Sequence, residues 1–140
     1  MTIPLVVLDT NLLVSAIRSK RGASFQVLSL VGTGLFDIAV SVPLVLEYED
    51  AMLRNVTSTA LDESDIHNII DYLCSVARRQ HIYFLWRPLL RDPKDDLVAE
   101  VAFAAGCDAI VTYNLRDFEG IEKLGLKILT PNEFLQEIRG

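Results

Sequence analysis

The sequence has little cysteine, a minority of basic residues and no long apolar run. Its only two cysteines, Cys74 and Cys107, lie far apart, which argues against a disulfide framework or a zinc cluster and predicts buried thiols in a reducing cytosol. No apolar stretch reaches the roughly 20 residues that a membrane span needs, and residues 1–4 lack the features of a secretory signal. We therefore expect a cytoplasmic protein with no membrane segment.

The charge balance is acidic, with 13 Lys and Arg against 19 Asp and Glu and a net charge of −6. Phosphate affinity comes mainly from Lys and Arg, so this balance by itself argues against a general nucleic-acid binder. Two other causes fit equally well. The carboxylates could gather around a cation, or a mostly acidic body could bind a basic partner.

The 140 residues, of which 51% are hydrophobic, fit a single domain over residues 1–140 with a substantial core. Strand-like apolar runs occur at residues 4–8, 36–40, 82–86, 109–112 and 126–129. Helical patterns separate them, at residues 11–18, 23–31, from 41, from 62, from 95 or 96 to 105, and from 130. This alternation predicts an α/β fold, a three-layer α/β/α sandwich with a mostly parallel central sheet.

Capping residues mark several helix ends. Ser41 precedes a helix with proline near its first turn, Asp62 is a good N-cap, and residues 130–133 (TPNE) form a capping box. Arg78 and Arg79 suit the C-terminal end of the helix that begins at Asp62.

Four acids share one end of the predicted sheet. Asp9 ends the first strand, and Glu47 lies about one turn into the helix after the second. Asp96 opens the helix before the strand at residues 109–112, and Asp117 follows that strand. Right-handed crossovers bring the carboxyl ends of parallel strands to one edge, where ligands bind in open sheets. The sequence therefore predicts that all four carboxylates meet there.

Clustered carboxylates repel one another, and a divalent cation relieves the repulsion. Oxygen ligands without histidine or cysteine favour Mg²⁺ or Mn²⁺ over zinc. Such an ion activates water and stabilises charge on a phosphoryl oxygen, which suits phosphodiester hydrolysis.

Each acid has a plainer explanation when taken alone. Asp9 or Thr10 could cap a helix, Asp117 could shape a turn, and Glu47 could be a surface residue. Asp95 and Asp96 could be first-turn residues that the helix dipole favours. The metal-site interpretation depends on the shared location.

Five segments of the chain resemble one known family. They are residues 7–11 (VLDTN), 41–48 (SVPLVLEY), 91–96 (RDPKDD, with Glu100 and Ala102 beyond), 110–118 (IVTYNLRDF) and 128–135 (ILTPNEFL). In this order the sequence resembles a PIN domain, of the type found as the toxin of toxin–antitoxin pairs. The resemblance spans nearly the whole chain.

The resemblance implies a Mg²⁺- or Mn²⁺-dependent ribonuclease whose catalytic acids and metal ligands are Asp9, Glu47, Asp96 and Asp117. Asp9 would be the central ligand, and Glu47 would hold metal or orient the attacking water. Asp95 is an equal candidate to Asp96. Many relatives carry an acid where this chain has Asn114, which leaves the division of labour with Asp117 open. Supporting hydrogen bonds would come from three further residues, Thr10, Asn11 and Thr112.

The resemblance also implies partners. Relatives often form homodimers, and toxin members are silenced by an antitoxin protein. For the RNA substrate, Arg116 beside Asp117 is the most attractive phosphate contact. Arg18, Lys20 and Arg21 are further candidates, although a helix C-terminus favoured by the dipole explains these three equally well. Arg87, Arg91 and Lys94 form a second basic stretch.

Two other functions compete with the ribonuclease. The acidic charge and Asn114 favour a catalytically silent RNA- or protein-binding module that keeps the fold. A phosphoryl-transfer domain with Asp9 as nucleophile is disfavoured, because the second aspartate of such sites is Asn11 here.

Overall fold

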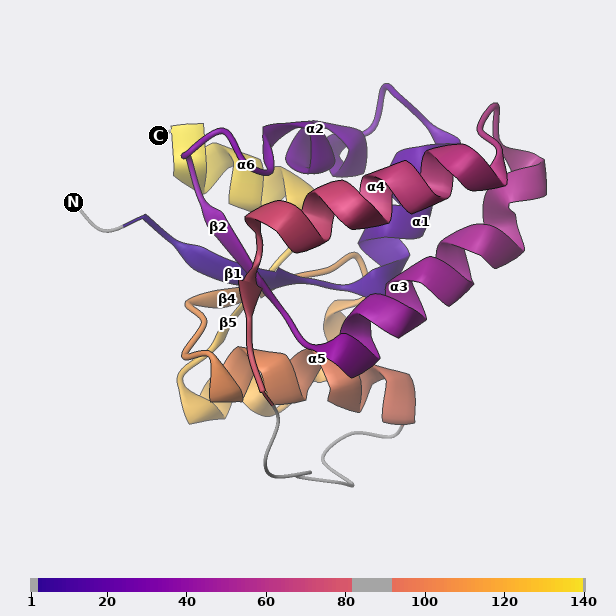
Figure 1. Cartoon of the computed structure of the whole chain (residues 1–140). Coiled ribbons are helices and arrows are strands. Elements are labelled where there is room, and N and C mark those ends of the chain that lie inside the picture. The colour runs from indigo at the N-terminus through magenta and orange to yellow at the C-terminus, as the bar shows by residue number, and fades with distance from the viewer. Residues whose placement is uncertain (1–2, 82–91, 140) are drawn as a thin grey trace.

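A five-stranded parallel sheet forms the centre of the computed structural model, which describes residues 3–81 and 92–139 (Figure 1). The spatial order of the strands is β3-β2-β1-β4-β5, and every neighbouring pair is parallel. The strands are β1 (Leu5–Leu8), β2 (Asp37–Val40), β3 (Arg78–Arg79), β4 (Ala109–Val111) and β5 (Lys127–Leu129). The predicted parallel sheet is confirmed.

Helices cover both faces of this sheet. In Figure 1, α1, α2, α4 and α6 lie on one side and α5 lies on the other. The α-helices of the described residues are α1 (Thr10–Arg18), α2 (Ala23–Leu30), α3 (Val42–Asn55), α4 (Glu63–Val76), α5 (Pro93–Ala104) and α6 (Pro131–Arg139). Short 3-10 helices follow at η1 (Val56–Ser58), η2 (Leu115–Phe118) and η3 (Ile121–Leu124). The arrangement confirms the expected α/β sandwich.

The first strand is buried from both sides. Val6, Val7 and Leu8 are each 0% exposed, because β1 lies in the middle of the sheet between the two helical layers. A parallel strand in this position needs apolar residues on both of its faces. The continuous apolar run at the start of the sequence is the trace of that environment.

The chain reverses its direction of growth across the sheet between β1 and β4. β2 and β3 lie on one side of β1, while β4 and β5 lie on the other. Leu8 is in register with Val111, so the residues that follow, Asp9 and Thr112, leave the sheet side by side. Such a switch point, at the carboxyl ends of the strands, is where open α/β sheets bind their ligands.

The predicted helix caps are present. The Ser41 hydroxyl accepts a hydrogen bond from the Leu44 N–H at 3.2 Å. Asp62 and Asp65 form a reciprocal capping box at the start of α4. The Thr130 hydroxyl and the Glu133 carboxylate do the same before α6, with the two bonds at 3.1 and 2.9 Å.

Two predicted boundaries are wrong. Arg78 and Arg79 do not end a helix; α4 stops at Val76, and the two arginines form β3 on the edge of β2. Pairing with Ala39 and Val40 satisfies backbone groups that a longer helix would have paired internally. The helix predicted from Asp95 or Asp96 begins at Pro93 instead, because Asp92 is its N-cap and accepts from the Lys94 N–H at 2.9 Å.

The strand predicted at residues 82–86 lies outside the described residues, as do Arg87 and Arg91. Within the described ranges, no helix combines the length and the apolar character that crossing a bilayer requires. Both cysteines are free thiols; Cys107 is buried, whereas Cys74 is only partly buried.

Candidate active site

A polar cavity of about 360 Å³ lies at the carboxyl edge of the sheet, beside the switch point. Its walls come from the start and end of α1, from α3, from the first turn of α5 and from η2. Five acids line it: Asp9, Glu47, Asp92, Asp95 and Asp117. Three basic residues line it as well: Arg18, Arg54 and Lys94.

Asp9 is the most deeply placed of these acids, with 3% of the residue exposed. The Thr112 hydroxyl donates a hydrogen bond to its Oδ2 at 2.7 Å. Burial raises the pKa of Asp9 above its ordinary value, and the charge of Asp117 raises it further. The Thr112 hydrogen bond and the backbone N–H groups of Thr10 and Asn11 lower the pKa but do not cancel the effect of burial. A second positive charge beside this carboxylate would therefore be stabilising.

Thr112 connects this carboxylate to the loop that carries Asp117. Its hydroxyl donates to Asp9 and accepts from the Asn114 N–H at 2.9 Å. Asn114 is exposed and precedes η2, and its carbonyl accepts from the Asp117 N–H at 3.0 Å. A single buried threonine thus fixes the position of one acid and the entry to the segment that bears another.

Tyr48 holds the strand from the other direction. The side chain is buried, and its hydroxyl donates a hydrogen bond to the carbonyl of Leu8, the residue before Asp9. Burial, and next the charge of Asp9, raises the pKa of Tyr48 well above its ordinary value, so the hydroxyl remains a donor.

The early start of α5 decides which of two adjacent acids faces the cavity. Asp95 lines it, whereas Asp96 is 1% exposed and is not part of the lining. Burial raises the pKa of Asp95 to about 7, and the negative charges of Asp117 and Asp9 add to this shift, followed by those of Asp92 and Asp96. Carboxylates from three separate segments are therefore close enough to oppose one another's ionisation.

Glu47 lines the same cavity but has a different environment. Its Oε1 lies 3.6 Å from Arg54 Nη2 and 3.6 Å from Lys94 Nζ. The side chain is only 13% exposed. Two cations thus compensate this carboxylate, while the aspartates mainly face other acids.

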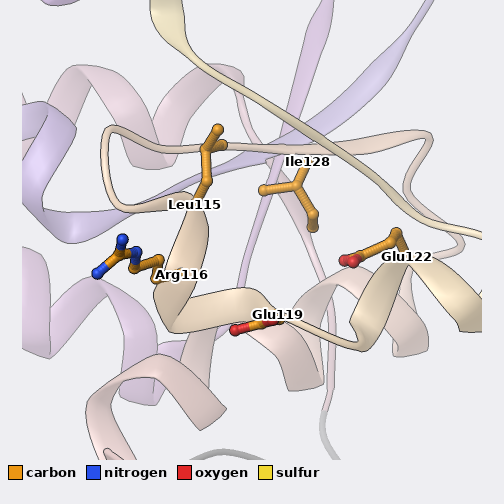
Figure 2. A pocket seen from close by; sticks show the side chains of 5 residues that line it. All are labelled: Leu115, Arg116, Glu119, Glu122 and Ile128. Atoms are coloured by element: carbon orange, nitrogen blue, oxygen red, sulfur yellow. The ribbon is translucent and has the colours of Figure 1, made fainter.

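The structure distributes the supporting and basic residues unevenly. Asn11 and Thr10 line the cavity, and the Thr10 hydroxyl is buried without a hydrogen-bond partner among the described residues. Arg18 also lines the cavity; Lys20 and Arg21 are exposed and are not among its lining residues. Arg116 lies on a neighbouring hollow of about 380 Å³, together with Leu115, Glu119, Glu122 and Ile128 (Figure 2).

The donors of the cavity fit a hard cation. They are carboxylate and hydroxyl oxygens, with no histidine or cysteine in the lining. Within residues 3–81 and 92–139, no group of three His, Cys, Asp or Glu side chains is arranged to hold an ion jointly. Mg²⁺ in proteins usually binds one or two carboxylates and keeps several waters, and the unpartnered Thr10 hydroxyl could pair with such a water. The residues present are therefore compatible with a hydrated divalent ion.

Sequence reasoning missed three residues of this cavity: Arg54, Asn55 and Asp92. A signal existed for two of them. Arg54 follows Glu47 by seven residues, which is two helical turns and the same helix face. Asp92 directly precedes a proline, the pattern of an N-cap followed by proline at the first helical position.

An α/β domain with an acidic cavity at its switch point describes this protein by fold and site. The family model of the PIN domain matches residues 5–116, which is most of the chain, and the chain therefore belongs to the PIN domain family.

One similar solved structure comes from the crystal structure of VapBC2 from Rickettsia felis bound to a DNA fragment from their promoter. The similarity covers 90% of this chain and 98% of that chain, at 22% identity and a TM-score of 0.57, and it shows a shared fold. A search of curated proteins finds no match.

Proposed function

We propose that this protein is a Mg²⁺- or Mn²⁺-dependent endoribonuclease. The observation that carries the proposal is the convergence of Asp9, Asp95 and Asp117, from three separate segments, in one cavity at the switch point of the sheet. Membership of the PIN domain family supports it, because PIN domains are in general nucleases.

Asp9 and Asp117 keep the role that the sequence suggested, as residues that hold the ion directly or through water. Asp95 is proposed in place of Asp96, because Asp95 faces the cavity and its ionisation is opposed by the other acids. When bound, the ion supplies an activated water and stabilises charge on the phosphoryl oxygen. Thr112 orients the Asp9 carboxylate, and Tyr48 fixes the strand end before it.

The test is cleavage of structured and unstructured RNAs by the purified protein, with Mg²⁺, with Mn²⁺ and with EDTA. We expect cleavage only with a divalent ion. Asp9→Asn should reduce the rate by at least about 100-fold, since even residues that only support metal ligands contribute 10- to 100-fold. Asp71→Asn, on the exposed surface of α4, is the matched control and should leave the rate unchanged. Cleavage in EDTA, or full activity of Asp9→Asn, would refute the proposal.

Binding without catalysis is the alternative outcome, suggested by Asn114 and the acidic charge. Isothermal titration with Mn²⁺ separates the two functions. No Mn²⁺ binding by a folded protein whose acids are intact would favour a silent RNA- or protein-binding module.

The proposal extends to the biological role as a toxin with an antitoxin partner. The similar structure from Rickettsia felis is a VapBC2 assembly bound to promoter DNA, and a comparable partner would silence this chain. We also propose a homodimer and a cytoplasmic location, where two free thiols would stay reduced. Expression of this chain should arrest growth, and co-expression of the adjacent reading frame should relieve the arrest. Growth that continues at full expression would count against the toxin role.

A further inference from the structure

The acidic cavity contains two electrostatically distinct groups. One is an aspartate group, Asp9, Asp95 and Asp117, in which each charge raises the pKa of another member. The other is centred on Glu47, whose carboxylate lies between Arg54 and Lys94. Among the causes that raise the pKa values of Asp9 and Asp95, Glu47 does not appear. Glu47 therefore belongs to a compensated group and not to the repelling one.

The cations around Glu47 remain available to a ligand. Arg54 and Lys94 side chains are each 53% exposed, in contrast to 13% for Glu47. Both contacts are 3.6 Å, longer than the 2.7–3.2 Å of a hydrogen bond, so they are ion pairs that leave N–H donors uncommitted. A guanidinium has five such donors, and the second carboxylate near Arg54, Asp50, engages its Nε at 3.1 Å. Nη groups and the Lys94 ammonium can still bind an anion.

Arg18 extends this group along the cavity. Its guanidinium donates to the Asn55 Oδ1, and the Asn55 amide donates to the Ala51 carbonyl at 2.7 Å. The C-terminal ends of α1 and α3 thus present two arginines toward the same cavity, and the first turn of α5 presents Lys94. We call these three residues, Arg18, Arg54 and Lys94, the basic rim.

A polyanionic substrate needs such a rim. A cavity lined by five acids repels a phosphodiester chain, and an ion in the aspartate group offsets only part of that charge. Since the whole chain carries a net charge of −6, attraction for phosphate must come from local positive charge. The basic rim is the positive charge that lies in the cavity itself.

We propose that the basic rim binds a backbone phosphate of single-stranded RNA beside the aspartate group, and that Glu47 is a positioning residue that holds Arg54 and Lys94 there. The proposal rests on the ribonuclease function and refines it, because it removes Glu47 from the metal ligands. The same carboxylate that compensates the two cations sets the distance between the phosphate site and the aspartates.

The first experiment measures binding of a fluorescently labelled single-stranded RNA 10-mer in EDTA, at several KCl concentrations. Each phosphate contact on a single strand contributes about 0.7 to the slope of log affinity against log salt. We expect Arg54→Gln and Lys94→Gln each to weaken binding and to reduce the slope by about 0.7. Arg54→Lys should keep the slope. Arg139→Gln is the matched control, because Arg139 contacts Gln26 and does not line the cavity.

The second experiment separates positioning from metal binding. Mn²⁺ affinity, measured by titration, should change less than about fivefold in Glu47→Gln, the effect of one screened charge. It should fall at least about tenfold in Asp9→Asn. A loss in Glu47→Gln as large as that in Asp9→Asn would make Glu47 a metal ligand and overturn its positioning role.

The outcomes also distinguish the two proposals. If the protein cleaves RNA but Arg54→Gln and Lys94→Gln keep the wild-type salt slope, the rim proposal fails and the ribonuclease stands. If the wild-type protein neither binds nor cleaves RNA, both fail.

Discussion

At the scale of single residues, the site shows how burial and like charge act on one carboxylate. Asp95 has its pKa raised to about 7, first by burial and next by Asp117 and Asp9. A raised pKa means that the folded state holds this proton more tightly than the unfolded state. The stability that this group contributes is complete below about pH 4 and is lost as the pH rises through about 7.

This shift predicts a pH-dependent gain for Asp95→Asn in the metal-free protein. At pH 4 the variant and the wild type should unfold at similar temperatures. At pH 8 the variant should be the more stable, because it no longer ionises beside the other aspartates. Thermal unfolding in EDTA at both pH values measures the difference.

The exposed Asp71 provides the control for this comparison. Asp71→Asn should give no comparable gain between pH 4 and pH 8. An equal stability difference for Asp95→Asn at both pH values would show that Asp95 is not opposed by its neighbours. With saturating Mn²⁺ at pH 8 the order should reverse, since the wild type binds the ion and the variant lacks one carboxylate.

At the scale of elements, α3 connects the stability of the fold to the site. It carries Glu47, Tyr48 and Arg54, and its start is fixed by the Ser41 hydroxyl. Ser41 itself is 3% exposed, so the capping bond is sheltered from water. The cap sets the rotation of the helix and hence which of its residues face the cavity.

Ser41→Ala should therefore lower the free energy of unfolding by about 1 kcal/mol, as the loss of an N-cap usually does. Urea unfolding measures this, and the slope of the transition should stay the same if only stability changes. Ser29→Ala provides the comparison, because its hydroxyl bonds to the Phe25 carbonyl within the exposed part of α2 and should matter by less than about 0.5 kcal/mol. Equal effects of the two substitutions would contradict the capping role.

At the scale of the whole molecule, the metal-free protein carries an unfavourable concentration of negative charge at one edge. A ligand that binds only the folded state stabilises it by about 2.7 kcal/mol at 100 times its dissociation constant. For a protein of this size we expect Mn²⁺ at that level to raise the melting temperature by roughly 5–10 °C. Differential scanning fluorimetry measures the shift.

Asp9→Asn is the variant that tests the site of this stabilisation. It should lose most of the Mn²⁺-dependent rise, whereas Asp71→Asn should keep it. An undiminished rise in Asp9→Asn would place the ion elsewhere on the acidic surface.

Local sequence patterns were sufficient for much of the fold. The apolar run at residues 4–8 required a strand covered on both faces, and the caps at Ser41, Asp62 and Thr130 fixed helix starts within a residue. These are short-range effects, so the sequence nearby contains the information. The same logic placed Asp9 and Asp117 at the carboxyl edge, because parallel strands with right-handed crossovers share that edge.

Contacts between distant segments decided the rest. Arg78 and Arg79 became a strand because the β2 edge offered backbone partners, which nothing in their local sequence shows. Asp95 rather than Asp96 faces the cavity because the cap at Asp92 sets the rotation of α5 against the sheet. The environment of Glu47 depends on Lys94, nearly fifty residues away, and on Arg54 two turns along its own helix. Sequence determines which charges exist and at which edge they meet; only the packed structure determines which of them repel and which are paired, because electrostatic energy depends on distance and burial.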